Sequence, residues 1–221
     1  EHVSIAIEQL VSGENELLKD KGLESGLVNI GASEIALHLF LLNELEVFHH
    51  HYPHVKLRIS NHSTPQAVQA LENGLVDFAV ISTPVALKKP LQRIPLYSFH
   101  EILIGGEEYA EMASKKHSLQ ELQDIPLIGI APGTSTRELY TQYFMRHNLP
   151  FSPDMEVATT DQILPMIQHN LGIGFLPEEL AAEHIANGKN VQIPIVEPLP
   201  ERKIWLIRNV KRPQSIAARR L

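Results

Sequence analysis

Hydrophobic and polar positions alternate along the chain in two kinds of short block. Blocks rich in β-branched and aliphatic residues predict strands, whereas apolar residues spaced three and four apart predict amphipathic helices. The predicted strands span residues 27–31, 55–60, 78–82, 102–105, 127–131, 155–158, 173–176, 191–196 and 203–207. The predicted helices span residues 34–50, 65–73, 118–123, 135–147, 161–170 and 178–187. This alternation is typical of α/β proteins with largely parallel sheets.

The order of these elements predicts two similar halves. A strand–helix–strand–helix–strand series occurs at 27–82 and again at 127–176. We therefore expect an α/β fold of two Rossmann-like lobes joined by two crossover segments, near residues 100–106 and 201–203. The first lobe would comprise residues 26–101 plus 204–221, and the second lobe residues 102–203.

The first 25 residues predict a separate element. Val3, Ile7 and Leu10 recur at roughly helical spacing within residues 1–20, and a polar, Gly-containing stretch follows. We interpret residues 1–25 as a linker helix and linker, whose narrow apolar stripe suits pairing with another chain or an upstream domain. Because the sequence begins with Glu1 and not Met, we expect it to be part of a longer chain.

The composition narrows the classes of function. The 221 residues have a formal net charge of −7, which disfavours direct binding to DNA phosphates. One basic cluster (Lys211, Arg212, Arg219 and Arg220) is typical of the solvated face of a last helix. Cys is absent, which excludes disulfides and thiolate metal sites. No run of about 18 apolar residues occurs, so we expect no membrane partner and a cytoplasmic location.

Five short motifs follow one another in an order that resembles a known family. They are residues 26–33 (GLVNIGAS), 48–55 (FHHHYPHV), 71–80 (LENGLVDFAV), 131–135 (APGTS) and 170–177 (NLGIGFLP). Together they resemble the effector-binding domain of bacterial LysR-type transcriptional regulators over roughly residues 26–210. The resemblance implies the fold of type II periplasmic binding proteins, a small-molecule effector, and a homodimer or homotetramer. It also implies an N-terminal winged helix-turn-helix domain, absent from this sequence, through which alone the full-length protein would contact DNA.

Candidate binding residues lie where helices begin after parallel strands. Open α/β sheets place ligands at the carboxyl ends of their strands, and the first turn of a helix offers unpaired backbone N–H groups to an anion. We therefore expect a small, polar, anionic effector between the lobes. The expected contacts are Ala32, Ser33, Ser63, Thr64, Ser82 and Thr83 in the first lobe, and Gly133, Thr134, Ser135 and Thr160 in the second. Ser33 and Thr64 are also predicted N-caps. We expect Glu34 to face outward, because inside the cleft it would repel an anion.

Signatures of catalysis, metal binding and cofactor binding are missing. Residues 49–54 (HHHYPH) are rich in His, but consecutive rings point in different directions, so we expect no metal site. Residues 133–137 (GTSTR) lack the last Gly of a nucleophile elbow. We therefore expect neither an enzyme nor a cofactor. The alternatives are a solute-binding protein of a transport system and, more remotely, an enzyme on the same fold. A helix-turn-helix pattern or a signal peptide upstream would distinguish a regulator from a transport protein.

Overall fold

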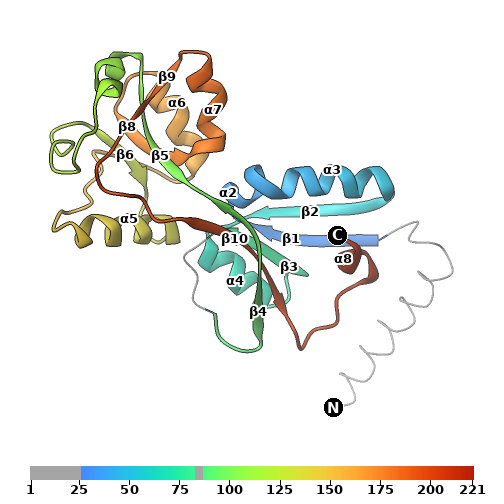
Figure 1. The fold of residues 1–221 in the computed structure, drawn as a ribbon. Coiled ribbons are helices and arrows are strands. Elements are labelled where there is room, and N and C mark those ends of the chain that lie inside the picture. The colour runs from blue at the N-terminus through green and yellow to red at the C-terminus, as the bar shows by residue number, and fades with distance from the viewer. Residues whose placement is uncertain (1–25, 83–86) are drawn as a thin grey trace.

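The computed structural model describes residues 26–82 and 87–221 as two α/β lobes that lie side by side (Figure 1). Each lobe is built on a five-stranded mixed sheet. The α/β architecture expected from the sequence is therefore confirmed. The linker helix expected within residues 1–25 lies outside the described residues.

The first sheet has the strand order β2-β1-β3-β10-β4. In it, β1 (Gly26–Ala32) pairs in parallel with β2 (Val55–Asn61) and β3 (Phe78–Ser82). The last strand of the chain, β10 (Arg202–Asn209), runs antiparallel to β3 and to β4 (Leu91–Phe99). The helices of this lobe are α2 (Glu34–Ala36), the π-helical turn η1 (Leu37–Leu41), α3 (Leu42–His51), α4 (Thr64–Glu72) and α8 (Ile216–Arg220).

The second sheet has the strand order β7-β6-β8-β5-β9. In it, β6 (Leu127–Ile130) pairs in parallel with β7 (Met155–Val157) and β8 (Ile173–Pro177). The strand β5 (Glu101–Gly106) runs antiparallel to β8 and to β9 (Asn190–Ile193). The helices of this lobe are η2 (Glu107–Ser114), α5 (Ser135–Arg146), η3 (Thr160–Gln162), α6 (Ile163–Gln168) and α7 (Glu178–Ala186).

The two lobes have the same strand topology and are connected by two segments of the chain. Three parallel strands, β2-β1-β3 or β7-β6-β8, are followed by an antiparallel strand, β10 or β5. The chain crosses between the lobes at His100, between β4 and β5, and again through residues 194–201, between β9 and β10 (Figure 1). Glu101 consequently lies in the second sheet, and residues 202–203 lie in the first.

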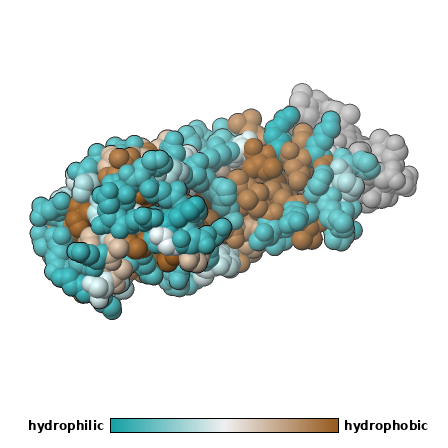
Figure 2. Space-filling model, turned by 90° about the horizontal axis from the view of Figure 1, so that it is seen from above, coloured by the Kyte–Doolittle hydropathy of each residue, from teal (hydrophilic) through white to brown (hydrophobic). Residues whose placement is uncertain are grey.

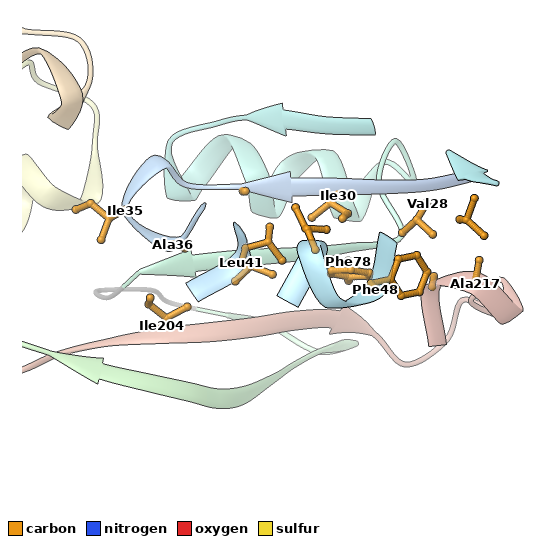
Figure 3. Close-up of a cluster of buried hydrophobic side chains, with 14 of the residues drawn as sticks. Val28, Ile30, Ile35, Ala36, Leu41, Phe48, Phe78, Ile204 and Ala217 are labelled. Carbon is orange, nitrogen blue, oxygen red and sulfur yellow. The ribbon is translucent and has the colours of Figure 1, made fainter. Parts of the chain in front are cut away.

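The apolar positions of the central elements form the cores. Every residue of β3, β5 and β8 is buried, as expected of central strands covered on both faces. In the first lobe, Val28 and Ile30 of β1 belong to one buried cluster with Phe48 of α3, Phe78 of β3 and Ala217 of α8 (Figure 3). A second cluster, rich in aromatic rings, lies in the other lobe. Each sheet therefore has a core of its own.

Some local expectations are wrong. The strand β4 was not expected, because Pro95 and several exposed polar residues interrupt its apolar pattern. The helix expected at residues 118–123 is replaced by turns at residues 119–124, although Ser118 and Glu121 exchange the two hydrogen bonds of a capping box. The helix expected at 34–50 is present but contains the π-helical turn η1. Along the described part of the chain, no helix combines the length and apolar character that a membrane span requires.

Candidate functional site

A cavity of about 400 Å³ lies between the two lobes, at the edges where the parallel strands end. Its walls are the residues that follow β1, β2 and β3 in the first lobe and β6 and β7 in the second. The lining residues are Ser33, Glu34, Ile35, Asn61, His62, Ser63, Thr64, Gln66, Ser82, and residues 130–136 and 158–160. The N-terminal ends of α4 and α5 therefore meet at one space.

Most of the expected contact residues line this cavity. They are Ser33, Ser63, Thr64, Ser82, Gly133, Thr134, Ser135 and Thr160. Ala32 does not line it: this residue is 1% exposed, and its carbonyl accepts a hydrogen bond from the backbone N–H of His62. Thr83 lies outside the described residues. Among the lining residues that were not expected, His62 lies in the loop before α4 and Thr136 in the first turn of α5, each next to an expected contact residue.

Ser33 occupies the N-cap position of α2, as expected, but its side chain makes no capping bond. The residue is only 7% exposed, and its Oγ has no hydrogen-bond partner. Most buried hydroxyl groups are hydrogen-bonded, because a hydroxyl group buried without a partner loses its hydrogen bonds to water and gains none in the protein. Ser33 therefore lines the cavity and keeps a buried hydroxyl whose donor and acceptor are both unsatisfied.

At α4 the capping residue is Ser63 and not Thr64. The Ser63 side chain and Gln66 form a capping box, in which Gln66 Oε1 accepts from the Ser63 N–H at 3.0 Å. Thr64 is the first helical residue, and its hydroxyl donates to the Ser82 carbonyl at 3.3 Å. The expectation for Thr64 is wrong because Pro65 fits either of the first two helical positions, so its presence alone does not locate the cap.

The helix α5 offers its first turn to the cavity from the other side. Gly133 precedes it with φ +87°, a left-handed conformation that a residue with a Cβ atom rarely adopts. Thr134 Oγ1 then caps the helix by accepting from the Arg137 N–H at 3.1 Å. The N–H groups of Ser135 and Thr136 precede the first intrahelical bond and face the N-terminal end of the helix. Ser135 and Thr136 both line the cavity.

Glu34 faces into the cleft, which contradicts the expectation that it faces outward. Its Oε2 accepts a hydrogen bond from the backbone N–H of Thr160 at 2.7 Å, across the gap between the lobes. Its side chain is 11% exposed, and its Oε1 lies 4.0 Å from the His38 ring nitrogen. Burial raises the pKa of this carboxyl above its usual value; the Asp161 charge adds to the rise, and bonds to the Asp161 and Thr160 backbone oppose it. The sequence gives no sign of this, because Thr160 lies far along the chain.

A network of buried charged side chains lies beneath the cavity, and the sequence pattern did not predict it. The guanidinium of Arg202 pairs with Glu101 at 2.5 Å, and the two side chains are 0% and 2% exposed. Arg202 also donates to Ser82 Oγ at 3.0 Å and to Thr136 Oγ1 at 3.1 Å, and both of these residues line the cavity. The Tyr140 hydroxyl donates to Glu101. This network connects both crossover strands to both lobes.

The structure shows what the remaining charged groups near the site contact. Arg137 donates to Glu156 at 2.5 Å and to the Ile130 carbonyl at 3.0 Å, so the wall of the second lobe already holds its guanidinium. Within residues 26–82 and 87–221, no three His, Cys, Asp or Glu side chains gather in a way that could hold a metal ion. The cavity therefore combines hydroxyl groups, helix N-termini and a single carboxylate.

The chain matches the model of a known protein family over most of its length. The family model of the LysR substrate binding domain matches residues 21–221. The chain belongs to this family. It is thus an effector-binding regulatory domain of the LysR type, as the sequence motifs indicated, and the family consists of transcriptional regulators and not of enzymes.

Relatives of known sequence agree with this LysR assignment. A probable RuBisCO transcriptional regulator of Trichormus variabilis is 26% identical over 203 residues, which cover 90% of this chain and 60% of the relative. The transcriptional activator CmpR of Synechocystis is 26% identical over 203 residues, covering 87% of this chain and 62% of the relative. This LysR domain therefore spans about three fifths of the length of these relatives.

Solved structures confirm the type II fold of the LysR effector-binding domains. The effector-binding domain of QuiR in complex with shikimate has a TM-score of 0.74 at 18% identity, covering 88% of this chain and 92% of that one. The Synechocystis CcmR regulatory domain in complex with 2-PG has a TM-score of 0.76 at 17% identity, covering 88% and 93%.

Proposed function

We propose that this LysR domain is the sensor of a bacterial, cytoplasmic transcriptional regulator. It binds a small polar effector with an anionic group in the cavity between its lobes. Binding then changes how an N-terminal winged helix-turn-helix domain contacts DNA. The domain itself contacts neither DNA nor a membrane and needs no cofactor.

The unpaired Ser33 hydroxyl is the observation that carries this proposal. It is buried, has no partner, and lies at the wall of a cavity whose opposite wall is the first turn of α5. An anionic group placed there accepts hydrogen bonds from the Ser33 hydroxyl and the α5 N–H groups, and the helix dipole favours its charge. The complexes of two structural neighbours with shikimate and with 2-PG support a small molecule as the effector.

Transmission depends on differential binding to two arrangements of the lobes. The two lobes are joined at the crossover strands, with Arg202 in the sheet of the first lobe and Glu101 in the sheet of the second. An effector that contacts both lobes favours the arrangement in which both sets of contacts form. In our proposal the linker helix within residues 1–25 passes this change to the DNA-binding domain.

We also propose that the chain forms homodimers or homotetramers. Figure 2 shows apolar surface gathered on one face of the first lobe. On this lobe, Leu42 and Val47 of α3 are 46% and 58% exposed, and Ile59 of β2 is 39% exposed. A patch of exposed large apolar side chains is typical of a surface that pairs with another protein.

The test is a calorimetric screen of carboxylates, amino acids and inorganic anions, followed by substitutions at the two walls. We expect Ser33→Ala to weaken the best hit about tenfold, the value of one hydrogen bond to a charged group. We expect Thr134→Ala to weaken it as well, because the Thr134 hydroxyl caps the first turn of α5 that faces the effector, while both proteins stay folded. Ser114→Ala is the matched control, because Ser114 is exposed and its hydroxyl donates only to the nearby Glu111 carbonyl. Unchanged affinity in both cavity variants would remove the assignment of this site.

A further inference from the structure

The cavity has a carboxylate on one wall and a helix N-terminus on another, and the lining residues that the structure describes include no Lys or Arg. Glu34 and His62 are the titratable side chains among the lining residues. The positive end is the first turn of α5, a twelve-residue helix whose dipole is directed at the cavity. Ser33, on the opposite wall, supplies a second polar group, because its Oγ is buried and has no hydrogen-bond partner.

Glu34 is held so that its charge stays at the cavity wall. The backbone N–H of Thr160 binds one carboxylate oxygen at 2.7 Å, which fixes the side chain across the cleft. The other oxygen lies 4.0 Å from the His38 ring nitrogen, which is longer than a hydrogen bond, and the Asp161 backbone also contacts the carboxyl. A carboxylate accepts up to about four hydrogen bonds, so Glu34 keeps the capacity to bind a further donor.

These positions constrain the charge of the effector. Because Glu34 lines this cavity of about 400 Å³, a like charge on a bound molecule is repelled by it and an opposite charge is attracted. A simple anion would gain the α5 N-terminus but would be repelled by Glu34. A molecule with an anionic group and a cationic group satisfies both ends.

We infer that the effector is zwitterionic: an ammonium carboxylate whose anionic group binds at Ser33 and the first turn of α5, and whose ammonium group binds Glu34. This inference rests on the proposed function and adds the class of effector to it. Glu34 is then the residue that selects amino acids and similar molecules over simple carboxylates.

The experiment compares pairs of molecules that differ only in the cationic group. Calorimetry at pH 7 on the whole chain would use the common amino acids, β-alanine and 4-aminobutyrate, each beside its hydroxy or des-amino counterpart, such as serine beside glycerate. We expect at least one ammonium carboxylate to bind ten times more tightly than its counterpart.

The Glu34→Gln variant tests the role of the carboxylate directly. Gln can still accept from the Thr160 N–H but carries no charge, so we expect the affinity for the ammonium carboxylate to fall at least tenfold and the affinity for its counterpart to rise. Glu46→Gln is the control, because Glu46 is an exposed residue of α3 in the same lobe and does not line the cavity. If Glu34→Gln does not fold, Glu34→Asp keeps the charge but withdraws it by one methylene group, and we expect a smaller loss.

The outcomes separate this inference from the proposed function. Simple carboxylates or sulfate that bind as tightly as amino acids, with a dependence on Ser33, would overturn the inference and leave the proposed function standing. An equal affinity of Glu34→Gln and the unchanged protein for the ammonium carboxylate would also overturn it. A panel in which nothing binds would reject both.

Discussion

Replacement of Glu101 by Gln removes the negative partner of the buried Arg202. Both side chains are inaccessible, and the acceptors that remain to the guanidinium include the neutral oxygens Ser82 Oγ and Thr136 Oγ1. Breaking a buried ion pair costs about 3–5 kcal/mol, because one charge stays buried without its counter-charge. For a chain of this size, each kcal/mol corresponds to about 2–4 °C, so we expect a loss of roughly 6–20 °C in Tm.

A double-variant cycle isolates the ion pair from the packing. Urea unfolding followed by circular dichroism would compare Glu101→Gln, Arg202→Met and the double variant. We expect the double variant to be more stable than the sum of the single losses implies, because no charge is left unpaired. Glu201→Gln is the matched control: the pair of Glu201 with Lys203 spans 3.7 Å between half-exposed side chains, and its loss should change stability by less than about 1 kcal/mol.

Two results would refute this reasoning. One is a Glu101→Gln variant whose unfolding midpoint moves no more than that of the exposed control. The other is strict additivity in the cycle, which would mean that the two charges do not stabilise each other across the crossover strands.

Three further predictions concern single residues. Thr134→Ala should lower the free energy of unfolding by about 1 kcal/mol, because it removes the α5 cap, whereas Ser33→Ala should lower it by less, since Ser33 Oγ has no partner; equal losses in urea unfolding would contradict this. Folding raises the pKa of the Glu34 carboxyl, so the folded protein binds this proton more tightly than the unfolded chain does. This group therefore contributes its full stability at low pH, and the contribution is lost as the pH rises through the folded pKa. Glu34→Gln should therefore gain stability over the unchanged protein between pH 4.5 and pH 7, and a gain that is constant with pH in thermal unfolding would count against it. Gly172→Ala should cost about 1–3 kcal/mol, because its Cβ would lie 2.3 Å from the Pro126 carbonyl oxygen, and a normal Tm would show that the backbone yields there.

The sequence by itself determined the architecture and most of the cavity wall. Strand and helix patterns can be read from neighbouring residues. The same strand–helix order occurs twice along the chain, which predicts two lobes. Because parallel strands share one direction, the residues after β1, β2 and β3 reach the same edge without any knowledge of tertiary contacts. The residues after β6 and β7 do so in the other lobe for the same reason.

Tertiary structure alone decided the charges around that cavity. Glu34 begins a helix, where a carboxylate is favourable in any direction, and only the Thr160 N–H, 126 positions away, turns it inward. Glu101 and Arg202 are separated by 101 positions and each stands at the first position of its strand, so each resembles a surface charge until the crossover strands bring them together. Pairing with β10 likewise makes β4 a strand. The local sequence pattern indicates which elements form and which of their residues are buried. The side on which a charged side chain is buried depends on its hydrogen-bond and ion-pair partners, which are distant in the sequence and come together only in the folded chain.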